Sequence, residues 1–320
     1  MIISGATPRL AGTPDATTRM SSFARYAWTV LAYNVAVILW GAYVRATGSG
    51  AGCGSHWPLC NGVVVPKSPA VATIIEFTHR AMTGIDVPLV ALLVIWAFLR
   101  FPRRHPVRIG AVLSAVFLTT EALIGAALVL LERVAKNASA VYTSAHLLNT
   151  LTLLGCLALT GWWAMGNPAP RLRQRWAWMP AVSLLAVGLL GISGAIAALG
   201  DTLFPSRSLA EGLAADVSPA ANALVRLRVW HPAIAACAGL WLVYFAFSSM
   251  KRARVSERPA WILILLVGAQ MVAGAVNLFL LAPVWMQMVH LLVADLLWIS
   301  LVIVCTSTLQ VFAVPSDRSN

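Results

Sequence analysis

Four histidines that lie inside long apolar runs are the side chains of this sequence best suited to metal chemistry. They are His79, His146, His231 and His290. An imidazole at membrane depth is costly, so it indicates a function by default. Zinc or copper would need three or four converging ligands, whereas pairs of histidines on facing helices suit the two axial positions of a haem iron. One such histidine alone would indicate a hydrogen-bonded packing residue, so the hypothesis rests on all four.

A carboxylate accompanies only the first of these histidines. Glu76 precedes His79 by three residues, so the two side chains share a helix face, and a carboxylate there can accept a proton. The residue three before His231 is Arg228 instead. This asymmetry predicts a reactive site in the first half of the chain and an electron-handling or structural site in the second. Four arginines are candidates to bind haem propionates, unless they only snorkel at the interface: Arg45, Arg80, Arg226 and Arg228.

The composition is that of a multi-span membrane protein. Of the 320 residues, 59% are hydrophobic and 11% are charged, whereas a soluble domain carries about 25% charged residues. The net charge of +12 does not indicate nucleic-acid binding, because the basic residues recur in short clusters between apolar runs. Runs of roughly 20 apolar residues are long enough to span a bilayer. The predicted spans lie near residues 23–44, 72–99, 107–131, 139–165, 176–199, 223–249, 259–282 and 285–312.

The distribution of lysine and arginine predicts how these spans are oriented. Both tails and the even-numbered links carry most of the basic residues, so the positive-inside rule places the two termini in the cytoplasm. The polar stretch before Phe23 lacks the apolar core of a cleavable signal peptide. We therefore predict a multi-pass protein of the bacterial plasma membrane, with the four histidines in one layer near the outer face.

The second four spans repeat the first four. Glu121–Ala127 matches Gln270–Val276, and Ala145–Leu148 matches Val289–Leu292. We expect an all-α membrane protein with eight transmembrane helices in two pseudo-symmetric four-helix bundles, related by an axis along the membrane normal. The predicted divisions are a cytoplasmic tail (1–22), an N-terminal half (23–165), a cytoplasmic linker (166–175), a C-terminal half (176–312) and a second tail (313–320).

Five cysteines fall into two classes. Cys53 and Cys60 lie in a glycine-rich outward loop, where an oxidising compartment favours a structural disulfide over the loop. A thiol pair that exchanges with a redox partner and a metal site with His56 are the alternatives. The remaining three lie inside apolar runs and are predicted to pack in the core: Cys156, Cys237 and Cys305.

Three polar residues lie deeper in the spans. Asn149 is expected to hydrogen-bond between helices. Glu121 and Asp295 are either proton relays or further interhelical bonds, and the sequence leaves these alternatives open.

Three stretches together resemble the haem A synthase family. They are Gly41–Gly50, the Cys53–Gly62 loop with its Trp-Pro-Leu-Cys sequence, and Ile75–Arg80; the resemblance extends from about Tyr33 to Val304. Members of this family are eight-helix membrane enzymes that oxidise one methyl group of haem O to a formyl group, which gives the haem A of cytochrome oxidases. The resemblance implies the same reaction and the same two-bundle fold here.

The resemblance also implies roles for individual residues. His79 and His146 would bracket the iron of the substrate haem O, and His231 and His290 would ligate a permanent haem b. Glu76 would be catalytic or handle protons, and Cys53 and Cys60 would form a disulfide. Glu121 stands where the repeat has Gln270, so its role is undefined.

The expected partners follow from that chemistry. Haem O would enter from the bilayer, supplied by a haem O synthase, and an electron donor of unknown identity would be required; a homo-oligomer is compatible with the sequence. Two competing hypotheses are a non-catalytic di-haem membrane cytochrome and a haem carrier or oxidase-assembly factor. A conduit across the membrane should hold haems at different depths, and the four histidines in one layer argue against it.

Overall fold

The computed structural model describes residues 20–131, 139–170, 175–253 and 257–310. Within these ranges every regular element is helical, and eight segments are long and apolar enough to cross a membrane. The predicted all-α, eight-span fold class is therefore confirmed. The spans are α1 (Ser22–Ala46), α2 (Val71–Arg100), α3 (Pro106–Leu131), α4 (Ser139–Ala164), α5 (Trp178–Leu203), α7 with α8 (Ala223–Arg228 and Trp230–Ala253), α9 (Glu257–Phe279) and α10 (Val284–Thr308).

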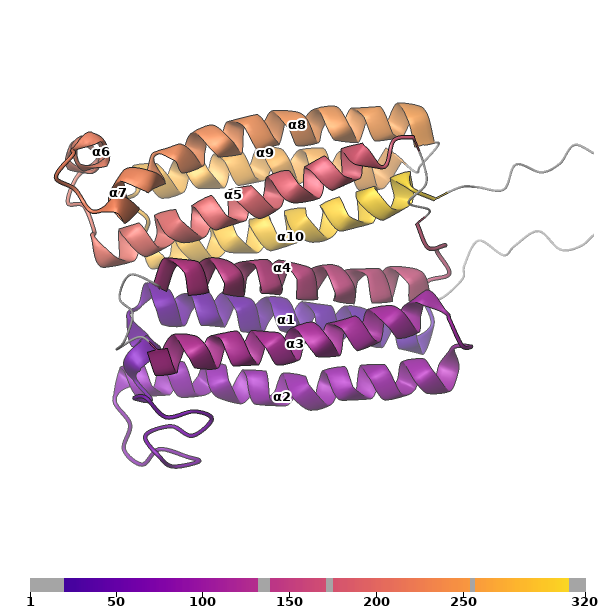
Figure 1. Ribbon diagram of the computed structural model, residues 1–320, viewed down its shortest axis with the longest axis horizontal. Coiled ribbons are helices and arrows are strands. Elements are labelled where there is room, and N and C mark those ends of the chain that lie inside the picture. Colours follow the sequence, from indigo (N-terminus) through magenta and orange to yellow (C-terminus); the bar gives the residue numbers. More distant parts are fainter. Residues whose placement is uncertain (1–19, 132–138, 171–174, 254–256, 311–320) are drawn as a thin grey trace, which may run out of the picture.

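The spans lie in two groups of four (Figure 1). In the first group α1 and α3 each contact α2 and α4, so α2 and α4 lie diagonally across a four-helix bundle. In the second group α5 and α9 each contact α8 and α10, and α8 and α10 also contact each other. Residues 1–19, 171–174 and 311–320 of the predicted tails and linker lie outside the described residues.

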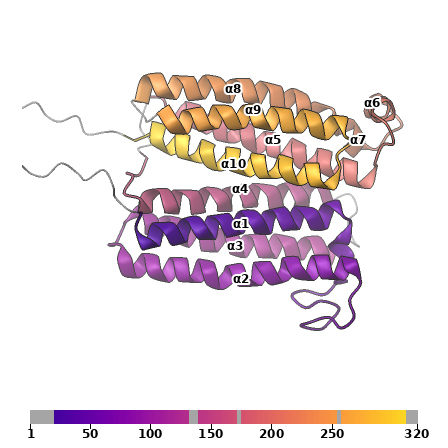
Figure 2. The ribbon, with the colours of Figure 1, turned by 180° about the vertical axis from the view of Figure 1, so that it is seen from behind.

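The two groups share one apolar core. Helix α4 packs against α5 and α10, and α1 packs against α10, as the reverse view in Figure 2 also shows. At this seam the Trp298 indole of α10 donates to the Leu151 carbonyl of α4 at 2.6 Å. Buried leucines from both groups, including Leu154 and Leu301, belong to the same cluster. Because the seam buries apolar side chains continuously, the two groups form one body.

Two loop regions lie at the same end of the molecule (Figure 1). The first joins α1 to α2 and contains the short 3-10 helix η1 (Ser49–Ala51). The second joins α5 to α8 and contains α6 (Leu209–Val217), whose N-terminus is capped by the Ser208 hydroxyl. The single span predicted for 223–249 is interrupted at Val229, which separates α7 from α8.

The cysteines inside the spans differ in their surroundings. Cys156 and Cys305 are buried, as predicted, but Cys237 is exposed on α8. The prediction of core packing is therefore wrong for Cys237. An apolar run in a membrane protein has no obligatory inward face, because its outer face meets lipid that is as apolar as the core.

Candidate functional site

Each of the four membrane histidines packs against a glycine of the preceding span. His79 lies against Gly41, His146 against Gly125, His231 against Gly194 and His290 against Gly274. A Cβ atom at Gly41 would lie 2.8 Å from the His79 ring, and one at Gly274 would lie 3.1 Å from the His290 ring. The glycines therefore provide the space that the imidazoles occupy. This repeated Gly–His contact appears once in each helix pair and puts all four rings near the loop end of the bundle.

The second-half histidines lie at a separation that fits one iron between them. The ring centroids of His231 and His290 are 6.5 Å apart. Two imidazoles on one metal ion have bonds of about 2 Å each, so their nitrogens lie about 4 Å apart and their ring centroids about 6 Å apart. The separation of the two rings is therefore compatible with a pair of ligands on one metal ion.

A hydrogen bond to Ser193 selects which nitrogen of His231 is free. The Ser193 hydroxyl donates to the Leu190 carbonyl at 2.8 Å, so its oxygen accepts from Nδ1 of His231 at 2.9 Å. With the proton on Nδ1, the lone pair lies on Nε2, which is the arrangement that a ligating histidine needs. An apolar groove of about 430 Å³ lies beside this contact, and its lining includes Ser193, Ile196 and Trp230.

The ligand set of the described residues matches haem better than a small metal ion. Among residues 20–131, 139–170, 175–253 and 257–310, no group of three or more His, Cys, Asp and Glu side chains converges on one point. Zinc and copper sites use such groups. Two histidines on diagonal helices fit the axial ligation of a porphyrin iron instead.

The first-half histidines have an acidic neighbour that the second-half pair lacks. Nδ1 of His146 lies 3.3 Å from an oxygen of Glu121, without hydrogen-bond geometry. His79 lies near His146 and Glu121. At the matching position of the second half, Gln270 lies 3.2 Å from Nε2 of His290. The same helix position thus contacts the histidine in both halves, with an acid in one and an amide in the other.

Asn149 and Thr150 hold the Glu121 side chain. The Asn149 amide donates to Glu121 at 2.6 Å and to the Phe117 carbonyl at 2.8 Å, and the Thr150 hydroxyl donates to the other carboxylate oxygen. The predicted interhelical bonding of Asn149 is confirmed. These bonds fix the carboxylate beside His146, so Glu121 belongs to the first-half site.

Glu76 connects its helix to the cysteine loop. Its side chain is buried, one oxygen accepts from the Cys53 N–H at 2.8 Å, and the other forms an ion pair with Arg80. Arg80 also donates to the carbonyls of His56 and Leu59. The carboxylate therefore holds the loop on the N-terminal end of α2, one helical turn from His79.

The cysteine loop is closed by the predicted disulfide. Cys53 and Cys60 are bonded, and both are buried. Their burial favours a structural bond over thiol exchange, and the bonded sulfurs offer no thiolate to a metal with His56. Gly52 touches α2 so closely that a Cβ there would lie 2.4 Å from the Ala72 carbonyl oxygen.

Arg228 holds the second outward loop against the helices, as Glu76 holds the first. It forms ion pairs with Asp201 at 2.9 Å and Asp216 at 2.5 Å, and it donates to the Gly212 carbonyl at 3.2 Å. These partners lie at the end of α5 and in α6. The residue three before the histidine is thus opposite in charge in the two halves, but in each half it holds the outward loop.

The four arginines predicted to bind propionates differ in how they are engaged. Arg80 and Arg228 are occupied by the loops, and Arg45 donates to Ala198, Thr202 and Gln287 across the seam between the halves. Arg226 is exposed, and its side chain has no hydrogen-bond or ion-pair partner among the described residues. Of the four, Arg226 has the guanidinium least engaged by the protein.

Comparison with known proteins identifies the family. The model of the COX15-CtaA family, described as cytochrome oxidase assembly protein, matches residues 24–302. The chain belongs to the COX15-CtaA family. This match covers both helix groups and all four Gly–His contacts, and the predicted resemblance to haem A synthases is confirmed.

The curated relatives of this chain carry two different names. A Thermus thermophilus protein named protoheme IX farnesyltransferase is 50% identical over 297 residues, which are 91% of this chain and 49% of that protein. A heme A synthase of Halalkalibacterium halodurans is 39% identical over 137 residues, 42% of this chain and 45% of its own. A heme A synthase of Exiguobacterium sp. is 40% identical over 97 residues, 30% of this chain and 32% of its own. The chain spans about half or less of the length of these curated relatives.

One buried acid of this COX15-CtaA chain was not predicted from the sequence. Asp86 lies on α2, two turns past His79, and is almost fully buried. The Asn34 amide of α1 donates to one of its oxygens at 2.9 Å, and the other oxygen has no partner among the described residues. An acid inside the run 81–99 was itself the signal, because intramembrane carboxylates are rarely incidental. Asp295 on α10 is likewise buried with an unpartnered oxygen.

Proposed function

We propose that this protein is a haem A synthase, which oxidises a methyl group of haem O to the formyl group of haem A. The observation that carries the proposal is the layer of four Gly–His contacts, in which Glu121 of the first half lies beside a histidine where the second half has Gln270. Membership of the family and the names of the heme A synthase relatives support it.

The two halves have different roles in this proposal. His79 and His146 bracket the iron of the substrate haem O, and His231 and His290 hold a resident haem b. The porphyrin irons supply the redox chemistry when they are bound. The chain itself orients the imidazoles through glycine contacts, fixes the His231 tautomer through Ser193, and keeps water from the site with the two tied loops.

Acidic groups of the first half handle the protons released as carbon is oxidised. Glu76 is the acceptor we propose first, because it lies one turn from His79 and its carboxylate is held in place by Cys53 and Arg80. Glu121 lies nearer to His146 and is the second acceptor. Proton handling of this kind contributes typically 10²–10⁴-fold in rate.

The supply of substrate is part of the proposal. The Thermus thermophilus relative is named for farnesyl transfer to protoheme IX, and this chain matches 49% of its length. We propose that haem O reaches this protein from a farnesyltransferase of that kind through the bilayer. The predicted orientation places the histidine layer toward the outer face of the bacterial plasma membrane and both termini in the cytoplasm.

A non-catalytic di-haem cytochrome or haem carrier is the competing function, since two axial histidine pairs would also serve it. Haem A production by the unmutated chain separates the two, and replacing Glu76 tests the proposed base. Glu76→Gln keeps an acceptor for the Cys53 N–H but removes both the base and the charge that pairs with Arg80, whereas Glu76→Asp keeps a carboxylate on a shorter side chain. We expect Glu76→Gln to bind haem in both halves and to lose most haem A production, while Glu76→Asp retains part of it.

The measurement is chromatography of haems extracted from cells that also express a haem O supply. Glu121→Gln, assayed in parallel, reports the second acid. Full haem A production by Glu76→Gln would remove Glu76 from the mechanism.

Replacing His231 or His290 by Ala should remove the low-spin haem spectrum of the purified protein, and an unchanged spectrum in both variants would contradict the proposed second-half haem site.

A further inference from the structure

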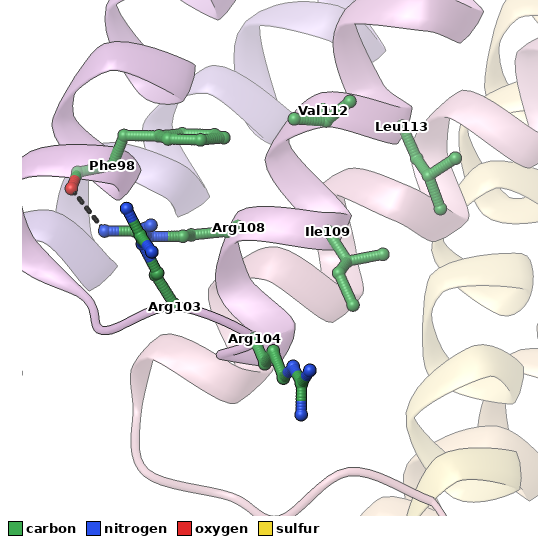
Figure 3. A pocket seen from close by; sticks show the side chains of 7 residues that line it. All are labelled: Phe98, Arg103, Arg104, Arg108, Ile109, Val112 and Leu113. Atoms are coloured by element: carbon green, nitrogen blue, oxygen red, sulfur yellow. Dashed lines mark hydrogen bonds between the residues drawn. The ribbon is translucent and has the colours of Figure 1, made fainter.

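An open groove of about 340 Å³ lies where α2 ends and α3 begins, at the opposite end of these helices from His79. Three arginines line it: Arg103, Arg104 and Arg108. The rest of its lining is apolar and comes from Phe98 and the first turns of α3. Figure 3 shows Val112 and Leu113 extending along α3 away from the arginines. The groove therefore has a cationic part and a hydrocarbon part.

The cationic part has no acidic partner within the described protein. No carboxylate of the described residues forms an ion pair with any of the three arginines. Arg108 donates to the Phe98 carbonyl at 2.7 Å and stacks on its ring at 4.8 Å, but its Nε is buried without a partner. Arg103 and Arg104 are exposed. Three positive charges at the N-terminus of α3 thus remain available to an anion.

The neighbouring histidine does not change this charge. Desolvation lowers the pKa of His105, and the charge of Arg108 lowers it further, which favours the neutral imidazole. The arginines supply the positive charge of the groove, and they stay charged across the physiological pH range.

The hydrocarbon part decides which anion fits. Ile109, Val112 and Leu113 are exposed on a helix apolar enough to span a membrane, so they face acyl chains rather than water. A free phosphate would leave this surface unused. Basic pockets between spans on the side that the positive-inside rule assigns to the cytoplasm suit acidic lipid head groups. We propose that this groove binds an acidic phospholipid, with the phosphate on the arginines and an acyl chain along α3.

Lipid binding to the detergent-solubilised protein tests this proposal by native mass spectrometry. The unmutated chain should bind phosphatidylglycerol about tenfold or more tightly than phosphatidylcholine, because each basic residue near a head group adds several-fold. The triple variant Arg103→Gln, Arg104→Gln, Arg108→Gln should lose that preference. The matched control Arg175→Gln, Lys251→Gln, Arg258→Gln removes the same charge outside the groove and should keep it.

Three results would overturn the proposal. They are a preference that survives in the groove variant, an equal loss in the matched control, and displacement of the lipid by glycerol 3-phosphate at equal concentration, which would indicate a free-anion site.

The double variant Arg103→Gln, Arg104→Gln replaces the triple variant if loss of the Arg108 contact to Phe98 prevents folding. The side chains of Arg103 and Arg104 have no hydrogen-bond or ion-pair partner among the described residues. The double variant should prefer phosphatidylglycerol over phosphatidylcholine several-fold less than the unmutated chain does. An unchanged preference would contradict the proposed lipid site. None of these readouts depends on haem A production.

Discussion

The Arg45 guanidinium of α1 lies 3.1 Å from the Gln287 side-chain oxygen of α10, and this contact joins the two halves at the level of the histidines. Gln287 precedes His290 by three residues, and Arg45 follows Gly41, the glycine against His79, by four. The same guanidinium donates to α5 through the Ala198 carbonyl at 3.0 Å and the Thr202 hydroxyl at 2.8 Å. One side chain of the first half therefore fixes two helices of the second.

Removing this contact should destabilise the assembled protein. A hydrogen bond to a charged group contributes about 1.5–3 kcal/mol, so Arg45→Gln should lower the free energy of unfolding by about 2 kcal/mol. Denaturant unfolding in detergent measures the difference. Arg226→Gln is the control, because Arg226 is exposed and its side chain has no partner among the described residues. Equal unfolding midpoints for the two variants would contradict the bridging role.

The Gly–His contacts predict a graded series of alanine variants. An added Cβ would lie 2.8 Å from the His79 ring at Gly41 and 3.0 Å from the His231 ring at Gly194, but 3.7 Å from the His146 ring at Gly125. Gly41→Ala should therefore displace the first-half histidine and lower haem A production, and Gly194→Ala should disturb the spectrum of the haem proposed for the second half.

Gly125→Ala is the matched control within the same repeat. Its contact is ordinary van der Waals distance, and alanine favours a helix by up to about 1 kcal/mol over glycine. Haem content and the absorption spectrum of the purified proteins show which of the glycine-to-alanine variants is most disturbed. If Gly125→Ala is as harmful as Gly41→Ala, the spatial explanation of these glycines is wrong.

The span pattern and the histidine layer could be predicted from the sequence because hydropathy, length and repetition are local signals. The partners of the arginines could not, since Arg80 and Arg228 are satisfied by loops whose folding back is a tertiary event. Hydropathy also reports which residues enter the membrane and not which way they face, so Cys237 was misplaced. Asp86 had its own signal as an acid in an apolar run, but its partner Asn34, 52 residues earlier on α1, could not be predicted from local sequence.

Loss of the disulfide should affect the first half alone. The Cys53 N–H holds Glu76 and the loop touches α2 through Gly52, so replacing both Cys53 and Cys60 by Ala should loosen this loop and lower haem A production. The His231 site, on other helices, should keep its spectrum. Intact-mass analysis after alkylation, with and without reductant, confirms that the unmutated protein holds the bond. A collapse of the second-half haem in the double variant would show that the loop acts more widely.

The proposed reaction is tested most directly by the haems that the unmutated chain produces. Cells that supply haem O should accumulate haem A when they express this protein with oxygen, and His79→Ala should abolish that product while the His231 haem remains bound. Chromatography of the extracted haems, with mass detection of the formyl product, gives the result. Haem O that stays unchanged in the presence of protein carrying haem in both halves would contradict the synthase and favour the cytochrome.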